Sequence, residues 1–188
     1  MARTFQYIPL FNGLTVLDNV KTAQQLHGRS SFLATMLSLP SYQRSERMLT
    51  QRAFAHLEEL GLAEYWDADA SAIPYGYQRK LEISRALATD PKILLLDEPA
   101  AGMNGQETAE ITGFNKEIHE RFRLTMVVVE PDMSLIMRLC QRIQVRNYGQ
   151  VIAEGMPVEI RANPKVIEAY LGTEAVEGAA AEPHARPA

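Results

Sequence analysis

Apolar residues recur at helical spacing along much of this chain. Between Val16 and about Leu26 they stand three or four positions apart, and Thr15 before them is a residue type that caps helix N-termini. A second such stretch runs from about Ser45 to Gly61, where the glycine suits the position just after a helix. Further helices are predicted over Phe32–Leu37, Tyr77–Ala88, Gln106–Phe122, Asp132–Cys140, Pro157–Ala162 and Pro164–Leu171.

Two short aliphatic runs interrupt the helical spacing. Residues Ile93–Leu96 and Leu124–Val129 show no regular alternation of apolar and polar side chains, so we expect both faces of each strand to be buried, as in a parallel sheet. The predicted helix over Gln106–Phe122 lies between them, which makes a strand–helix–strand unit. From Ile143 to Ala153 the chain alternates around a Tyr-Gly pair, as is typical of an antiparallel hairpin. Together these patterns predict an α/β fold.

Composition narrows the class of protein. Of the 188 residues, 46% are hydrophobic and 22% are charged, a balance typical of one soluble globular domain. No run of about 18 apolar residues is present that could cross a membrane. The net charge of −4 argues against a protein that wraps nucleic acid. The single Cys140 excludes a disulfide framework and a multi-cysteine metal site, and no signal-peptide pattern stands at the N-terminus.

Two adjacent carboxylates follow the first aliphatic run. Asp97 and Glu98 stand where a parallel strand delivers its last side chains to the carboxyl edge of the sheet, the edge at which open α/β folds bind ligands. There Asp97 suits a hydrated Mg²⁺, and Glu98 suits a positioned water. For the pair taken alone, a solvated strand end is the alternative.

A glycine stands at the start of the helix predicted just before that strand. Residues 73–79 place Gly76 and the neighbouring backbone N–H groups at the positive end of the helix, which suits a phosphate. A plain turn glycine explains Gly76 equally well.

Four segments, in a fixed order, carry a resemblance to a known family. They are RTFQ with PLFNGLTVLDNV, then YGYQRKLEISRALATDPKILLLDEPAAGMN, then VVVEPDM, and last GQVIAEGMPVEIRANPKVIEAYLG. With them the chain resembles the nucleotide-binding subunits of ABC transporters, and within these the ATP-binding subunits of branched-chain amino-acid importers. The resemblance implies an incomplete P-loop NTPase-like α/β domain over residues 1–172, with parallel core strands and a helical subdomain at about residues 13–75. Residues 173–188 are rich in Ala, Glu, Pro and Gly and are expected to be disordered.

The resemblance implies a role for each motif residue. Gln6 matches the glutamine loop, which in the family touches the Mg²⁺ and the attacking water. Asp97 matches the metal-holding Walker B aspartate, and Glu98 matches the catalytic glutamate. Asn104 stands in the loop that links the two nucleotide sites of a dimer. Residues 73–78 match the signature loop, which contacts the γ-phosphate of ATP across that dimer, and they include the cofactor-binding candidates Tyr75, Gly76, Tyr77 and Gln78.

ATP and Mg²⁺ are the cofactors that the resemblance implies. The expected partners are transmembrane permease subunits, which the helical subdomain faces, and a second ATP-binding subunit in a head-to-tail dimer. Nucleic acid is not an expected partner, and the transported amino acid is not expected to touch this subunit. The expected location is cytoplasmic, peripheral on the inner face of the cell membrane.

The chain departs from the family pattern in three respects. No G-x-x-x-x-G-K-[ST] phosphate loop occurs in the 188 residues, and only five residues precede Gln6, so we expect a copy truncated before the glutamine loop. Pro131 stands where the family has its switch histidine, and it offers no side-chain donor. Pro74 stands in the signature loop where the family usually has a small residue.

These departures predict impaired ATP binding and hydrolysis by this chain alone, which leaves its status as an enzyme open. Two alternatives to the ATP-binding subunit remain: a non-enzymatic module that docks a membrane partner, and a non-functional gene remnant. In the family the missing segment supplies a strand of the central sheet. We therefore expect this chain alone to expose an apolar edge and to self-associate.

Overall fold

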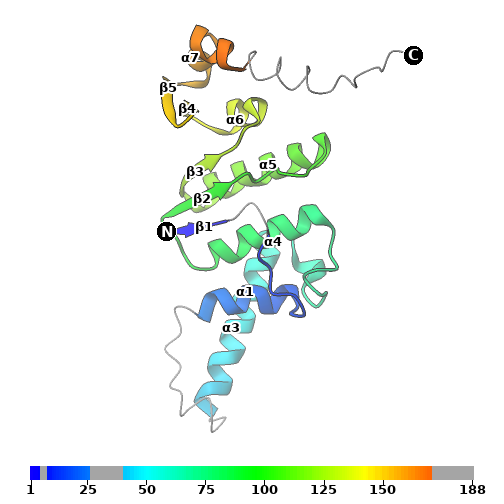
Figure 1. Cartoon of the computed structure of the whole chain (residues 1–188). Coiled ribbons are helices and arrows are strands. Elements are labelled where there is room, and N and C mark those ends of the chain that lie inside the picture. The colour runs from blue at the N-terminus through cyan, green and yellow to red at the C-terminus, as the bar shows by residue number, and fades with distance from the viewer. Residues whose placement is uncertain (5–7, 26–39, 171–188) are drawn as a thin grey trace, which may run out of the picture. The chain divides into compact units, whose positions relative to one another are not determined.

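The computed structural model describes residues 1–4, 8–25 and 40–170 (Figure 1). The chain divides into two compact units, residues 1–135 and 136–188. The first contains, in order, β1 (Ala2–Arg3), α1 (Val16–Gln24), α3 (Pro40–Glu59), the 3₁₀ turn η2 (Ala63–Tyr65), α4 (Tyr75–Leu87), β2 (Ile93–Asp97), α5 (Gly105–Phe122) and β3 (Thr125–Val129). Helix α6 (Met133–Leu139) spans the division, and β4 (Ile143–Asn147), β5 (Gln150–Gly155) and α7 (Pro157–Arg161) follow.

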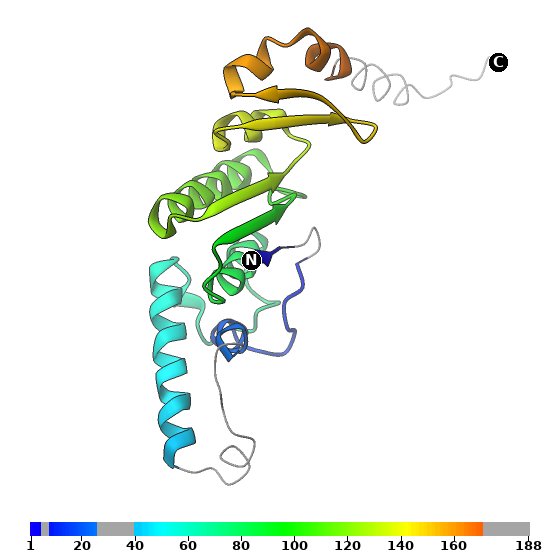
Figure 2. The same ribbon diagram turned by 90° about the vertical axis from the view of Figure 1, so that its left-hand side faces the viewer.

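A three-stranded parallel sheet organises the first unit. Its strand order is β1-β2-β3, so the strand nearest the N-terminus pairs with β2. β2 and β3 pair along their full length, from Ile93 opposite Thr125 to Asp97 opposite Val129. Figure 2 shows these two strands side by side, with α5 as their connection. The predicted strand–helix–strand unit is confirmed to within one residue at each boundary.

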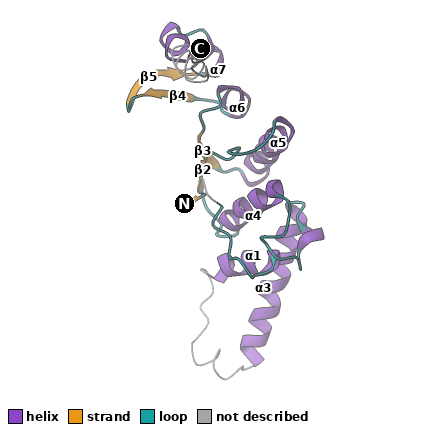
Figure 3. Ribbon diagram, turned by 45° about the vertical axis from the view of Figure 1, so that its right-hand side comes forward, coloured by secondary structure: helices purple, strands orange, loops and turns teal. Residues whose placement is uncertain are grey.

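Buried aliphatic side chains from β2 and four helices form one core. On β2 the alternate residues Leu94 and Leu96 point into it. Figure 3 shows α4 and α5 on the same side of the strands, which is the side this core occupies. The helical members of the core include Val16 and Val20 of α1, Ala53 and Leu57 of α3, Leu81 and Ile83 of α4, and Ile111 and Ile118 of α5.

Among the described residues, helices cover only one face of β2 and β3, which corrects the expectation that both faces are covered. Ile93, Val127 and Val129 are 37%, 45% and 60% exposed. In the β2–β3 register they share a face with Asp97, whereas Leu96 points to the opposite, helix-covered face. Because the packed helices cover a single face, an aliphatic run does not imply double burial here.

Local signals set the ends of the first two long helices. Thr15 caps α1 as predicted, because its Oγ1 accepts the N–H of Asp18 at 3.0 Å. Helix α3 begins at Pro40, earlier than the predicted Ser45, since proline is favoured at the first helical position. Gly61 follows α3 with φ +69°, the left-handed conformation that glycine adopts freely after a helix.

The second unit is built on the predicted hairpin. β4 and β5 pair antiparallel, with Ile143 opposite Gly155 and a register shift within the ladder. Tyr148 and Gly149 form the turn with φ +45° and +79°, the two positive angles that a tight two-residue turn requires. Residues 164–170 are helical, as predicted. The buried apolar side chains of this unit are Ile136, Ile143, Ala153, Ile160 and Val166.

Several expectations are not addressed by the described residues. The helix at Phe32–Leu37, the tail at 173–188 and Gln6 lie outside them. A single domain over residues 1–172 and a helical subdomain at about 13–75 stay predictions. None of the helices within residues 8–25 and 40–170 combines the length and the apolar character needed to cross a bilayer.

Truncation of Leu57 should destabilise the first unit. This side chain is fully buried in the core, so Leu57→Ala leaves a cavity and should lower the free energy of unfolding by about 2–5 kcal/mol. Urea denaturation followed by circular dichroism measures the change. Met48→Ala on the same helix, where the side chain is 53% exposed, is the control and should shift unfolding by about 0.5 kcal/mol or less. Equal effects of the two substitutions would contradict the assigned core.

The exposed valines of β3 should promote self-association. Replacing both Val127 and Val129 by threonine keeps the side-chain shape and removes exposed apolar surface, so the monomer fraction should rise several-fold in sedimentation velocity. The control Val158→Thr, at a 71% exposed residue of α7, should leave the distribution unchanged. Association that is the same in all three proteins would show that this face is not responsible.

Candidate functional site

The turn that carries Asp97 and Glu98 has an unusual backbone. Asp97 is the last residue of β2, and the N–H of Glu98 donates to the carbonyl of Val129 at 2.8 Å, which extends the ladder with β3. Glu98 has φ +45°, in the left-handed region that few residues with a side chain adopt. Such outliers cluster at functional sites. The chain thus leaves the sheet in a left-handed turn directly after Asp97.

Arg3 forms an ion pair with Asp97, which no pattern in the sequence indicated. Its Nη2 lies 2.8 Å from Asp97 Oδ2, and the two side chains are 55% and 29% exposed. Parallel pairing places Arg3 opposite Leu95, on the same face of the sheet as Asp97. The available signal was the position of the arginine, three residues before Gln6, in a segment that turns out to be the neighbouring strand.

Thr4 continues the attachment of this N-terminal segment to β2. It is 1% exposed, and its N–H donates to the carbonyl of Leu95 at 2.9 Å. Its hydroxyl lies 3.4 Å from the N–H of Asp97, at the long end of hydrogen-bond distance. Arg3 and Thr4 therefore hold the end of β2 through both of their side chains, through the β1–β2 pairing and through the backbone bond of Thr4.

Glu130 lies beside the loop that follows the carboxylate pair. Its carboxylate accepts the N–H groups of Ala100 and Asp132 at 3.4 and 3.5 Å, which joins that loop to the segment after β3. Burial raises the pKa of Glu130 above its ordinary value, while these two N–H groups act in the opposite direction. The negative charge of Glu98 is a smaller cause of the rise, which places the two carboxylates within electrostatic reach.

Helix α4 begins at Tyr75, two residues before the predicted start, so Gly76 lies inside its first turn. Pro74 occupies the N-cap and makes no side-chain cap bond. The Tyr75 hydroxyl donates to the carbonyl of Ala101 at 3.1 Å, so the helix start touches the loop after β2. A Cβ built on Gly76 would meet nothing within 4 Å, so the space beside this residue is open.

The other cofactor-binding candidates are engaged in local contacts. Tyr77 packs against Tyr65 with ring centres 4.7 Å apart. The Gln78 amide donates to the carbonyl of Ile73 at 2.9 Å, in the loop that leads into α4. Asn104 caps α5 through a capping box, since its Oδ1 accepts the N–H of Glu107 at 3.0 Å. These contacts explain all three side chains without a nucleotide.

The donor chemistry at the end of β2 fits a magnesium ion. Mg²⁺ prefers oxygen ligands and is usually held by one or two carboxylates together with waters and substrate phosphates. Asp97 and Glu98 supply such oxygens, and the Asp97 carboxylate is partly exposed. Within the described part of the chain, no group of three or more His, Cys, Asp or Glu residues is arranged as a metal cage. Gln6, the other metal candidate, lies outside that part.

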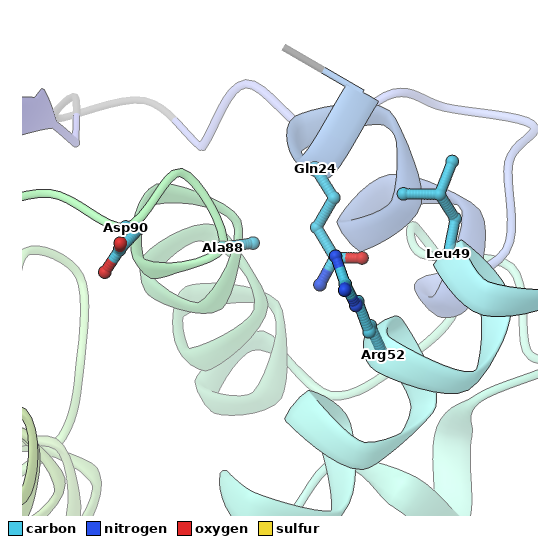
Figure 4. Close-up of a pocket in the computed structure, with 5 residues that line it drawn as sticks. All are labelled: Gln24, Leu49, Arg52, Ala88 and Asp90. Atoms are coloured by element: carbon cyan, nitrogen blue, oxygen red, sulfur yellow. The ribbon is translucent and has the colours of Figure 1, made fainter. Parts of the chain in front are cut away.

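A surface hollow of about 260 Å³ lies elsewhere in the first unit. It is lined by residues of α1, α3 and the end of α4, and Figure 4 shows Gln24 and Arg52 pointing into it. None of the predicted site residues lines it. The lining residues are Gln24, Leu49, Arg52, Ala88 and Asp90.

Relatives of known name support a single family. The chain is 41% identical over 172 residues to the high-affinity branched-chain amino acid transport ATP-binding protein BraF of Pseudomonas aeruginosa. It is 42% identical over 172 residues to the protein of the same description, LivG, of Escherichia coli. Each alignment covers 92% of this chain and 68% of the relative.

Solved structures give the same result for the fold. The ADP conformation of MJ1267, an ATP-binding cassette of an ABC transporter, matches with a TM-score of 0.71 and 30% identity, over 91% of this chain and 68% of that one. A dimeric post-hydrolysis state of the ATP-binding cassette MJ0796, bound to ADP and Pi, matches with a TM-score of 0.64 and 25% identity, over 83% and 62%. The fold is thus that of an ABC ATPase cassette, an α/β fold of P-loop NTPase type.

Family profiles match both ends of the chain. The profile of branched-chain amino acid ATP-binding cassette transporters matches residues 150–176. The ABC transporter profile matches residues 1–101, which include the start of α4 and the Asp97-Glu98 pair. The chain therefore belongs to the ABC transporter family, among its ATP-binding proteins.

Proposed function

We propose that this chain is part of the ATP-binding, energy-coupling subunit of an importer for branched-chain or related amino acids. The observation that carries the proposal is the likeness of 41–42% identity over 172 residues to two transport ATP-binding proteins for such amino acids. Two adjacent carboxylates at the end of β2, followed by a loop that the Tyr75 hydroxyl of α4 contacts, support the same reading.

Each carboxylate has its own part in this proposal. Asp97, with Gln6, would hold Mg²⁺, which when bound neutralises charge on the phosphates of ATP. Glu98 is the catalytic candidate, because it follows the last residue of β2 in a left-handed turn and lies within electrostatic reach of Glu130. From there it would orient and polarise the attacking water.

The partners follow from the same proposal. A second ATP-binding subunit would meet the start of α4, with Tyr75, Gly76, Tyr77 and Gln78, and Asn104 in a head-to-tail dimer. The dimeric state of the cassette MJ0796 supports this, since its fold is similar. Transmembrane permease subunits would contact the helices within residues 13–75, and the chain would lie on the cytoplasmic face of the membrane through that contact. The transported amino acid would not touch it.

A non-enzymatic docking module is the second candidate. It is favoured by Pro131, which stands where a phosphate-contacting histidine is usual and has no side-chain donor. Under this reading the carboxylates are retained without turnover.

This 188-residue polypeptide by itself should not bind Mg-ATP tightly. Without the phosphate loop, the main source of phosphate contacts is absent from the chain, and losing even one preorganised donor costs about 10²–10³ in rate. Isothermal titration with Mg-ATP should give no saturable heat in the micromolar range. Saturable binding at micromolar concentrations would show that other residues of this chain cradle the phosphates.

Replacement of Glu98 separates the two candidate functions. In membranes containing the permease, the partner subunit and a complete ATP-binding subunit that includes this chain, Glu98→Gln should lower ATP-driven uptake of a branched-chain amino acid by about 10²-fold or more, because a positioned catalytic base contributes that much. Glu110→Gln on α5 removes an equivalent exposed charge and should leave uptake unchanged. Uptake that depends on this chain and is unaffected by Glu98→Gln would favour the docking module.

A further inference from the structure

The Arg3 guanidinium lies against the Asp97 carboxylate, which is the metal ligand in the proposed function. The guanidinium contacts Asp97 Oδ2 at 2.8 Å. It arrives from the neighbouring strand, because the parallel register puts Arg3 and Asp97 on the same face of the sheet. A divalent cation such as Mg²⁺ would bind the same carboxylate oxygens of Asp97.

We propose that Arg3 is a resident counter-ion of Asp97 which a divalent cation has to displace, so that metal binding and the anchoring of β1 oppose one another. This inference rests on the proposed metal-holding role of Asp97. It assigns to Arg3 a positioning role, since the arginine acts through the carboxylate and not on the nucleotide.

Charge makes the two cations competitors. Arginine stays protonated at every physiological pH, so its positive charge cannot be relieved by loss of a proton. A divalent cation on the same carboxylate would be repelled by the guanidinium at close range. The Arg3 side chain is 55% exposed, so it can move into water without leaving a buried charge unpaired. Displacement is therefore open to Arg3 in a way that it would not be to a buried arginine.

The Arg3–Asp97 pair is one of several contacts that anchor β1, together with the packing of Ala2 against the core and the contact of the Thr4 hydroxyl with the Asp97 N–H. β1 has only two residues, Ala2 and Arg3, paired with Leu94 and Leu95. Beyond that pairing, the N–H of Thr4 donates to Leu95 at 2.9 Å. Because the ion pair helps to hold this segment against β2, a cation that displaces Arg3 from Asp97 loosens the segment. By linkage, loosening the segment must in turn favour the cation.

Mn²⁺ binding tests the competition without any activity measurement. The probe is Mn²⁺ alone, with free ion measured by electron paramagnetic resonance on the full 188-residue chain. Arg3→Gln should bind Mn²⁺ about three- to tenfold more tightly than the wild type, because a pairing and a repulsion are removed together. Arg121→Gln is the matched control, since it removes the same charge from a residue paired with Glu59 on α3. Arg3→Lys keeps the charge and should stay near the wild-type affinity.

Amide hydrogen exchange gives a second readout at Thr4. Added Mg²⁺ should speed exchange of the Thr4 N–H in the wild type, because displacement of Arg3 loosens the segment that this N–H anchors. In Arg3→Gln, exchange at Thr4 should already be fast and should not respond to Mg²⁺. A purely structural ion pair would give no response to Mg²⁺ in either protein.

The outcomes separate this inference from the proposed function. Asp97→Asn should abolish Mn²⁺ binding, and retained binding would remove Asp97 from the metal site and both proposals with it. If Asp97→Asn loses binding while Arg3→Gln matches the wild type or binds more weakly, the metal role stands and the counter-ion role is wrong. If no protein in the set binds Mn²⁺, Arg3 has nothing to compete with and the inference is overturned.

Discussion

Parallel pairing of β2 with β3 decides where the polar ends of this unit come together. Asp97 lies opposite Val129, so the turn at Glu98 and the segment carrying Glu130 leave the sheet at the same edge. Pairing of β1 on the other side of β2 brings Arg3 and Thr4 to that edge as well. Residues far apart in sequence thus become neighbours through backbone hydrogen bonds, before any side-chain contact is considered.

One-sided packing is the second consequence of that sheet. Helices α4 and α5 bury the face of Leu94 and Leu96, and the opposite face keeps its valines in contact with water. The charged pair Arg3–Asp97 lies on this open face, where solvent lowers the cost of separating the two ions. A site whose charges must change partners is better served by such a face than by a dry core, where an unpaired charge is costly.

Helical spacing and aliphatic runs were sufficient to predict the order and type of the described α-helices and of the strands from β2 onward, because amphipathic periodicity reflects the core that they share. They wrongly predicted burial of both strand faces, since coverage of the second face depends on which elements pack against it. They did not predict the buried pair of Arg79 and Glu82, 2.7 Å apart with side chains 0% and 4% exposed, because charged residues are rarely interior. The proposal for Asp97 and Glu98 came from their place after a strand together with the family resemblance, whereas the contact with Arg3 required the register of a two-residue strand that periodicity cannot detect.

At the left-handed turn of Glu98, conformational stability and the presence of a carboxylate favour different residues. A φ of +45° is free of cost for glycine and costs an ordinary residue roughly 1–2 kcal/mol, so conformational stability alone would favour glycine at this position. Glycine would remove the only carboxylate that the turn presents beyond Asp97. Any selection for a more heat-resistant version of this fold would therefore act against the carboxylate that the proposed function requires, a trade-off between thermostability and proposed chemistry confined to one backbone angle.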